Sequence, residues 1–208
     1  MSKPVVDVII ARYQEDLSWI EPINDLATVY IKDPNTPTKL LLYKQPILLQ
    51  NCIGREGDTY VKHILKHYPN FPDYTVFMQG RIDDHVASVD DVLSMIRAVS
   101  SNKLIAKNMP PYVGLAQMWD VVRDFRDPHY NIPLREAWFS FFAEPPPNNA
   151  LKVNYSGCFM ASREAILFHS KAFYERMNDV LQVDHLWGHI FERLWGVVFD
   201  MRTKSVYD

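Results

Sequence analysis

The chain has few of the residues that mark several large protein classes. It holds only two cysteines in 208 residues, Cys52 and Cys158, which are far apart. They fit a reducing compartment and cannot form a cysteine-based zinc site. The formal net charge is −3 and no block of lysine or arginine occurs, so the basic surface that nucleic-acid binding requires is missing. We therefore expect no nucleic-acid partner.

Long apolar runs are also missing. No run of the chain approaches the length of a membrane span, and residues 1–4 lead directly into a strand-like segment rather than a signal peptide. We therefore expect a cytoplasmic protein with no transmembrane segment. The length suits one α/β domain, so residues 1–208 are predicted to form a single unit.

The order of apolar segments predicts an α/β fold. Residues 5–11 (VVDVIIA) are almost continuously apolar and rich in β-branched side chains, as in a strand buried on both faces of a parallel sheet. Residues 61, 64, 65 and 68 repeat with the spacing of one buried helical face. Further strands are expected at residues 27–32, around 47–50, at 74–78 and at 153–161, and helices at 58–68, 89–99, 171–181 and 184–199.

This alternation predicts a mostly parallel central sheet flanked by helices. Ser88 and Asp91 have the spacing of a helix N-cap. Residues 100–150 are rich in proline and aromatic side chains, and we expect them to form an irregular lid or binding surface. His63 and His67 are predicted to lie on or near the exposed side of their helix.

Polar clusters follow three of the predicted strands, and ligands of parallel sheets bind at the carboxyl ends of strands. The first cluster is Arg12 to Asp16, where Tyr13 is suited to a nucleotide base and Arg12 to a phosphate. Asp33 follows the second strand. The alternative for the first cluster is a solvated loop in which Tyr13 covers the core.

Another cluster, Asn51 to Gly57, stands just before a predicted helix. Its two glycines permit a sharp turn, and a helix N-terminus attracts anions. Arg55 is a candidate for a bidentate clamp on a diphosphate. The alternative is a helix-entry turn in which Arg55 and Glu56 pair locally.

The segment Gln79 to His85 brings two adjacent carboxylates, Asp83 and Asp84, to the end of a buried strand. Carboxylate oxygens are the ligands that Mg²⁺ and Mn²⁺ prefer, often shared with substrate phosphates. The alternative is that both aspartates cap or solvate a turn.

The last predicted helix carries His185, His189 and Glu192, with Asp184 just before it. The i, i+4, i+7 spacing can place the first three on one face, as a metal site or as a general base with an orienting partner. The zinc-protease motif is absent because no glutamate follows His185. The alternative is a hydrogen-bonded structural group within an apolar helix.

Several short motifs resemble an uncharacterised family found in fungi and some large DNA viruses, known only as a domain of unknown function. They cover most of the chain, and the resemblance implies membership but no activity. The motifs are Gly54-Arg55-Glu56 with Tyr60, Pro72-Asp73, the segment from Cys158 to Glu164, Phe173-Tyr174, and Glu192 with Trp195.

The layout also resembles the GT-A glycosyltransferases. Residues 8–16 are similar to their first strand and its turn, and Asp33 stands where an acidic residue meets the base. Residues 156–159 look like the strand that borders their acceptor site. The resemblance implies a GT-A-like, Rossmann-related domain, a UDP-type sugar donor, and an acidic base from the last helices, Glu192 or Asp184.

The chain departs from that family where an Asp-x-Asp motif would stand, because Gln79-Gly80-Arg81 takes its place. Either Asp83 or Asp84 binds Mn²⁺ or Mg²⁺ through a shifted loop, or Arg81 replaces the charge of the metal. We predict a glycosyltransferase that acts on a glycan or other hydroxyl acceptor. The alternatives are a metal-dependent hydrolase built on His185, His189 and Glu192, and a non-catalytic glycan-binding module.

Overall fold

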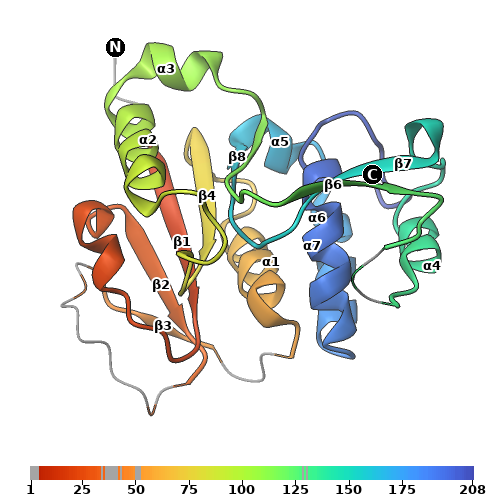
Figure 1. Cartoon of the computed structure of the whole chain (residues 1–208), viewed down its shortest axis with the longest axis horizontal. Helices are drawn as coiled ribbons and strands as arrows, with labels where there is room; N and C mark the ends of the chain where they lie inside the picture. The colour runs from red at the N-terminus through yellow and green to blue at the C-terminus, as the bar shows by residue number, and fades with distance from the viewer. Residues whose placement is uncertain are drawn as a thin grey trace.

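A six-stranded sheet forms the centre of the protein. The computed structural model describes residues 5–33, 35, 42, 44–49, 53–127, 129 and 131–208, apart from the side chain of Pro147. The order is β3-β2-β1-β4-β8-β5; β1 to β4 run parallel, and β8 is antiparallel to both neighbours (Figure 1). The strands are β1 (Val6–Arg12), β2 (Ala27–Ile31), β3 (Ile47–Leu48), β4 (Tyr74–Gln79), β5 (Tyr112–Gly114) and β8 (Phe159–Ser162). The predicted mostly parallel α/β architecture is confirmed.

Side chains of the sheet alternate between two separate apolar cores. Val8 and Ile10 of β1 face one core, and Ile9 and Ala11 face the other, since successive strand residues point to opposite faces. The 3-10 helix η1 (Ser18–Ile23), α2 (Val89–Ser101) and α3 (Lys103–Asn108) cover the first face. The second face is covered by α1 (Arg55–His67), α5 (Arg163–Leu167), α6 (Lys171–Leu181) and α7 (Leu186–Val198).

The helix boundaries follow local signals in most places. The Ser88 hydroxyl accepts a hydrogen bond from the Asp91 N–H at 3.1 Å, which confirms the predicted N-cap of α2. Helix α6 has the predicted bounds, whereas α1 begins at Arg55, three residues before the predicted start. None of the helices in the described part of the chain is long and apolar enough to cross a membrane.

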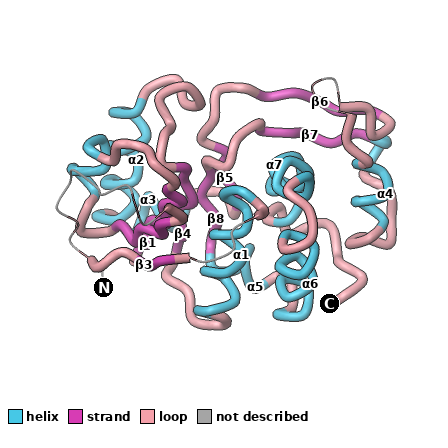
Figure 2. Tube along the Cα trace, turned by 90° about the horizontal axis from the view of Figure 1, so that it is seen from below, coloured by secondary structure: helices cyan, strands magenta, loops and turns pink. Residues whose placement is uncertain are grey.

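The prediction of one strand at residues 153–161 is wrong. The chain forms β7 (Ala150–Asn154) there, turns through residues 155–158 and only then enters β8. Strand β7 pairs with β6 (Trp119–Arg123) in a separate two-stranded sheet beside α7 (Figure 2). The turn brings Gly157 against the Glu56 and Tyr60 side chains of α1, where only a residue without a side chain allows so close an approach.

Residues 100–150 are more regular than predicted. They contain α3, β5, β6, α4 (Leu134–Phe139) and the short η2 (Pro147–Asn149). Most of the aromatic side chains in this part fill the second core; the Trp138 indole is fully buried and donates to the Glu144 carbonyl at 2.7 Å. Among the described aromatic residues of this part, Trp119 and Phe139 are exposed.

The prediction of an exposed His63 is also wrong. The His63 side chain is 1% exposed, and its Nδ1 lies 3.0 Å from the Tyr30 hydroxyl. The His67 ring, half-buried, stacks on it with centroids 4.4 Å apart. Helix α1 packs between the sheet and α6, so it is buried over a wider arc than its apolar stripe indicates.

Candidate functional site at the carboxyl edge of the sheet

The order in which successive strands are added to the sheet reverses between β1 and β4. It proceeds from β1 outward to β2 and β3, then returns through α1 to β4 on the other side of β1. The connections on the two sides of β1 belong to opposite faces, η1 to one and α1 to the other. Such a reversal opens a crevice at the carboxyl ends of the two strands. The polar clusters predicted after β1, β2 and β4 all lie at this edge (Figure 1).

The turns after β1 and β2 contact each other directly. The side-chain amide of Gln14 donates to Oδ2 of Asp33 at 2.7 Å, and the Tyr13 ring beside it is 55% exposed. The Lys32 ammonium donates to the backbone carbonyl of Arg55 at the start of α1. These contacts join two of the predicted clusters and α1 into one surface. Asn51 and Cys52 of the cluster before α1 lie outside the described residues.

The turns after β1 and β4 lie against each other, with the Glu15 carboxylate between them. Oε2 of Glu15 accepts a hydrogen bond from the Tyr13 N–H at 2.7 Å. A Cβ atom on Gly80 would lie 2.6 Å from that same oxygen, so a side chain at this position would displace the Glu15 carboxylate. The Trp19 indole donates to the Gly80 carbonyl at 2.8 Å. The edge therefore has a fixed shape at the point where the chain reverses.

A hollow of about 640 Å³ lies at this reversal, and we call it the switch-point hollow. Its volume falls in the range of about 300 to 1,000 Å³ that is usual for small-molecule sites. Its wall combines an exposed phenol, an indole, a guanidinium and carboxylates, from Tyr13, Gln14, Glu15, Trp19, Arg81 and Asp83 among others.

Arg81 occupies the space between the two aspartates predicted to bind metal. Its Nε lies 2.9 Å from Oδ1 of Asp83 and 3.8 Å from Oδ2 of Asp84. This interaction lowers the pKa of Asp83 and raises that of Arg81. Within the described residues, no three histidine, cysteine or acidic side chains are grouped so as to hold a metal ion. In this arrangement the carboxylates do not fit a divalent cation, and we derive no step through one.

Arg12 is turned away from the predicted phosphate position. Its side chain is 1% exposed and its Nε donates to the backbone carbonyl of Glu15 at 2.9 Å. The guanidinium therefore stabilises the turn after β1 from the interior of the protein. Arg81, in contrast, is exposed at this edge, with 63% of its side chain accessible.

A second group of charged side chains begins at the N-terminus of α1 and continues along α7. Nη1 of Arg55 lies 2.9 Å from Nε2 and 3.3 Å from Nδ1 of His189. Nδ1 of His189 lies 3.7 Å from Oε2 of Glu192, which accepts a hydrogen bond from Nη1 of Arg193 at 2.8 Å. We call this set the charged row; with Glu56 and Asp127 at its ends it contains Glu56, Arg55, His189, Glu192, Arg193 and Asp127.

Burial sets the protonation of the two central groups. Desolvation raises the pKa of Glu192; Arg193 opposes this rise, and the Glu56 carboxylate adds to it. Desolvation lowers the pKa of His189, and the Arg55 and Arg193 cations lower it further. Because arginine can only donate, the ring nitrogen nearest Arg55 presents a lone pair. A neutral imidazole therefore stands beside a carboxylate with an increased affinity for a proton.

The backbone at the start of α1 is strained. Arg55 adopts φ of 56°, a left-handed conformation that costs a residue with a side chain about 1 to 2 kcal/mol. Non-glycine residues in this region concentrate at functional sites. The conformation holds Arg55 where its carbonyl meets Lys32 and its guanidinium meets His189.

The turn before β8, which contains Gly157, lies between the end of β4 and the charged row. The Tyr60 hydroxyl donates to the Gly157 carbonyl at 2.7 Å. A Cβ atom on Gly157 would lie 2.6 Å from Cγ of Glu56 and 3.3 Å from Nε2 of Gln79. Glu56 of the charged row and Gln79 at the end of β4 thus flank the same glycine.

The predicted face of three side chains on the last helix is only partly assembled. His189 and Glu192 meet, but the His185 side chain is 74% exposed and lies 3.2 Å from Asp184. Asp184 also accepts a hydrogen bond from the Leu186 N–H at 2.9 Å. Both residues lie at the exposed beginning of α7, so Glu192 is the candidate base that the structure places within the charged row.

Sequence reasoning missed several members of the charged row. Sequence reasoning pairs Glu56 only with Arg55 and His189 only with its neighbours on the last helix, and it assigns no catalytic role to Arg193 or Asp127. The signal for Arg193 was present, because Glu192-Arg193 is the only acidic–basic pair in an otherwise apolar helix. Asp127 carries no sequence signal, since only the fold brings it to α7.

A comparison with known families identifies the group to which this sequence belongs. The sequence profile described as "Protein of unknown function (DUF3431)" matches residues 8–207. The chain belongs to this family. No curated protein and no solved structure matches it. The family resemblance that the motifs carried is thus confirmed, and the description of the family assigns no activity.

Proposed function

We propose that the chain is a glycosyltransferase of the GT-A type, which transfers a sugar from a UDP-type donor to a hydroxyl of a glycan or other acceptor. The observation that carries the proposal is the switch-point hollow, an open site with aromatic and cationic side chains at the carboxyl ends of β1 and β4. Nucleotides bind at this position in open parallel sheets. As the compartment we propose the cytoplasm, where Cys158 would remain a free buried thiol.

The side chains of the hollow, together with Asp33 on the adjoining turn, match the parts of a nucleotide. The exposed Tyr13 ring offers a stacking surface for the base. Asp33, held by Gln14, offers a carboxylate to base or ribose donors. Arg81 supplies a cation for the diphosphate, in the position where the GT-A enzymes that the sequence resembles carry their metal-binding motif.

The charged row supplies the groups for transfer. In the proposed reaction, Glu192 accepts the proton of the acceptor hydroxyl, and the acceptor oxygen forms a bond to the anomeric carbon. The bond from that carbon to the diphosphate oxygen breaks, and the electron pair leaves with the diphosphate. Arg81 and Arg55 stabilise the negative charge that develops on it.

Nucleotide binding tests the proposal directly. The purified chain is melted with UDP, with CMP and without ligand. We expect UDP to raise the melting temperature, since a ligand at about 100 times its Kd adds about 2.7 kcal/mol to the free energy of unfolding. Tyr13→Ala should abolish the increase. Trp119→Ala, which removes an exposed aromatic ring outside the hollow, should retain it. Absence of any shift with either nucleotide would overturn the proposal.

A further inference from the structure

A second hollow, of about 560 Å³, lies apart from the carboxyl edge, and we call it the β5–β6 hollow. It is enclosed by the edge strand β5, the β6–β7 sheet and the residues that follow α7. No member of the charged row lines it. Its apolar wall includes three prolines and three aromatic side chains: Pro110, Pro111, Pro146, Tyr112, Trp119 and Trp138.

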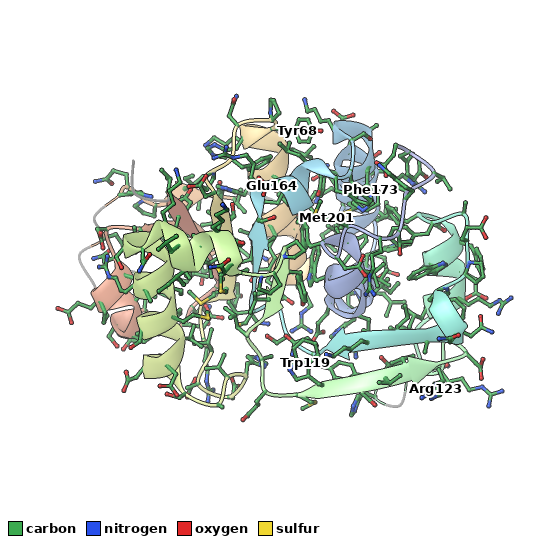
Figure 3. All side chains as sticks on the ribbon, turned by 90° about the horizontal axis from the view of Figure 1, so that it is seen from above. Tyr68, Trp119, Arg123, Glu164, Phe173 and Met201 are labelled. Atoms are coloured by element: carbon green, nitrogen blue, oxygen red, sulfur yellow. The ribbon has the colours of Figure 1, made fainter. Side chains whose placement is uncertain are left out.

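Trp119 is held in place at one side of this hollow and remains accessible. A Cβ atom on Gly114 would lie 2.8 Å from Cη2 of the indole, so the absence of a side chain lets Trp119 approach the end of β5. The residue is nevertheless 43% exposed. Figure 3 shows its side chain at the start of β6, at the opposite end of that strand from Arg123. A fixed, exposed indole is a binding surface with a low entropic cost of ordering.

Several side chains of the hollow offer hydrogen-bond donors. Among the described residues, neither the Trp119 indole N–H nor the Tyr112 hydroxyl has a hydrogen-bond partner. Burial raises the pKa of Tyr112, so its hydroxyl keeps its proton. The Lys152 ammonium lies 4.6 Å from the centroid of the Trp119 ring, and no carboxylate in the described part of the chain pairs with it.

The carboxylate in this hollow is already engaged. Oδ2 of Asp200 accepts hydrogen bonds from Nε and Nη2 of Arg202 at 3.0 and 2.9 Å, and Oδ1 accepts one from the Arg202 N–H at 2.9 Å. The side chains of the hollow thus offer donors and a cation, together with apolar rings. A matching ligand presents acceptors and apolar rings but few donors.

A proline-rich segment has this composition. Each proline contributes a carbonyl acceptor and no N–H, and the polyproline II helix exposes these carbonyls with no internal hydrogen bonds. Its pyrrolidine rings pack against aromatic side chains, and its preformed shape reduces the entropy lost on binding.

We propose that the β5–β6 hollow binds a proline-rich segment of a partner protein in the polyproline II conformation. The Trp119 indole N–H and the Tyr112 hydroxyl donate to its carbonyls, and the two aromatic rings pack against its pyrrolidine rings. Lys152 selects segments in which an acidic residue adjoins the prolines, because the unpaired ammonium attracts a carboxylate. This inference is independent of the proposed transferase activity.

NMR spectroscopy of the ¹⁵N-labelled full chain tests the proposal. The indole resonance of Trp119 is assigned by its disappearance in Trp119→Phe, and a polyproline peptide of about ten residues is titrated. We expect that resonance to shift with saturation, and a peptide with a terminal glutamate to bind more tightly. Trp119→Ala should weaken binding by about tenfold or more. Lys152→Met should remove the preference for glutamate and leave binding of the neutral peptide unchanged.

The matched control is Trp187→Phe, which changes an indole outside the hollow and should bind the peptide as the parent does. A Trp119 resonance unmoved by peptide at concentrations on the order of 1 mM would overturn the proposal. So would a response of that resonance to a neutral oligosaccharide without a response to the peptide. The peptide and oligosaccharide titrations contain no nucleotide, so a negative result in them does not bear on the proposed transferase activity.

Discussion

The guanidinium of Arg193 lies 2.8 Å from the carboxylate of Asp127, and both side chains are buried, with 1% and 0% exposure. The two residues are 66 positions apart. The same guanidinium donates to Glu192 at 2.8 Å and lies 4.9 Å from the centroid of the Tyr155 ring. One buried cation therefore ties the segment after β6 to α7 and fixes the orientation of the candidate base.

Removal of this cation should be strongly destabilising. Arg193→Met leaves the Asp127 carboxylate buried without its cation, and we expect the free energy of unfolding to fall by about 3 to 5 kcal/mol. Urea denaturation measures the change. Arg202→Met is the matched control, because Arg202 is 79% exposed and pairs with Asp200 at the surface; it should cost about 1 kcal/mol or less. Similar losses in both variants would contradict this assignment.

Glu192→Gln should separate a catalytic carboxylate from a structural one. The raised pKa of Glu192 means that its stabilising contribution exists below the unfolded pKa and is lost as pH rises through the folded value. At pH 7 the ionised group is a cost to folding, so we expect the amide to leave the melting temperature unchanged or higher. Release of UDP from a sugar donor should fall by about 10² or more. A lower melting temperature with intact turnover would reject Glu192 as the base.

The two aspartates after β4 can be tested without a substrate. Because Arg81 already holds both carboxylates, we expect UDP to bind with the same affinity with and without Mn²⁺. Calorimetry measures the affinity for UDP with and without Mn²⁺ in the parent and in the double variant Asp83→Ala/Asp84→Ala. Arg81→Met should weaken UDP binding by about tenfold, as expected for loss of one charge-assisted contact. Binding that requires Mn²⁺ and disappears in the double variant would instead make the aspartates metal ligands.

Arg55 cannot contact His189 and a diphosphate equally well. If UDP draws the Arg55 guanidinium away, His189 loses the cation that helps to lower its pKa, and that pKa should rise towards the usual value. NMR titration of histidine ring protons with and without UDP measures the change. In Arg55→Gln the pKa of His189 should already be higher, and UDP should change it less. If UDP binds and the titration of His189 is unchanged, Arg55 does not contact the diphosphate.

His63 should make the fold sensitive to acid. Burial, with smaller effects from His67 and nearby lysines, lowers the pKa of His63 to about 3. The unfolded chain therefore binds a proton at His63 near pH 6.5, whereas the folded chain binds it only near pH 3. The free energy of unfolding consequently decreases as the pH falls from 6.5 to 3. At pH 4.5 the loss should reach about 3 kcal/mol relative to pH 7.

Denaturation at both pH values tests this dependence as a difference between variants. His63→Gln should remove that part of the pH dependence, since glutamine does not titrate. His185→Gln, a change at a side chain that is 74% exposed, should keep the parental dependence. An equal slope in the parent and in His63→Gln would show that other groups control the response to acid.

The strands of the parallel half and several helix boundaries were predictable because their causes are local. The apolar run of β1 and the N-cap at Ser88 depend on residues within one element. The positions of the polar clusters after β1, β2 and β4 were predictable for a related reason, since parallel strands place their carboxyl ends at one edge. The predicted switch-point residues Tyr13, Asp33 and Arg81 therefore lie at the same edge.

Contacts between distant segments decided the rest. The strand predicted at residues 153–161 is divided because its first half pairs with β6 and its second half pairs with β4 and β5. His63 is buried because α1 lies between two layers. The charged row depends on α1, α7 and the segment after β6 meeting in space, which no local periodicity encodes. The sequence by itself determined the class of fold and the edge that carries polar residues. Only the tertiary structure decided which charges meet, because desolvation and Coulomb interactions act through space and are independent of position along the chain.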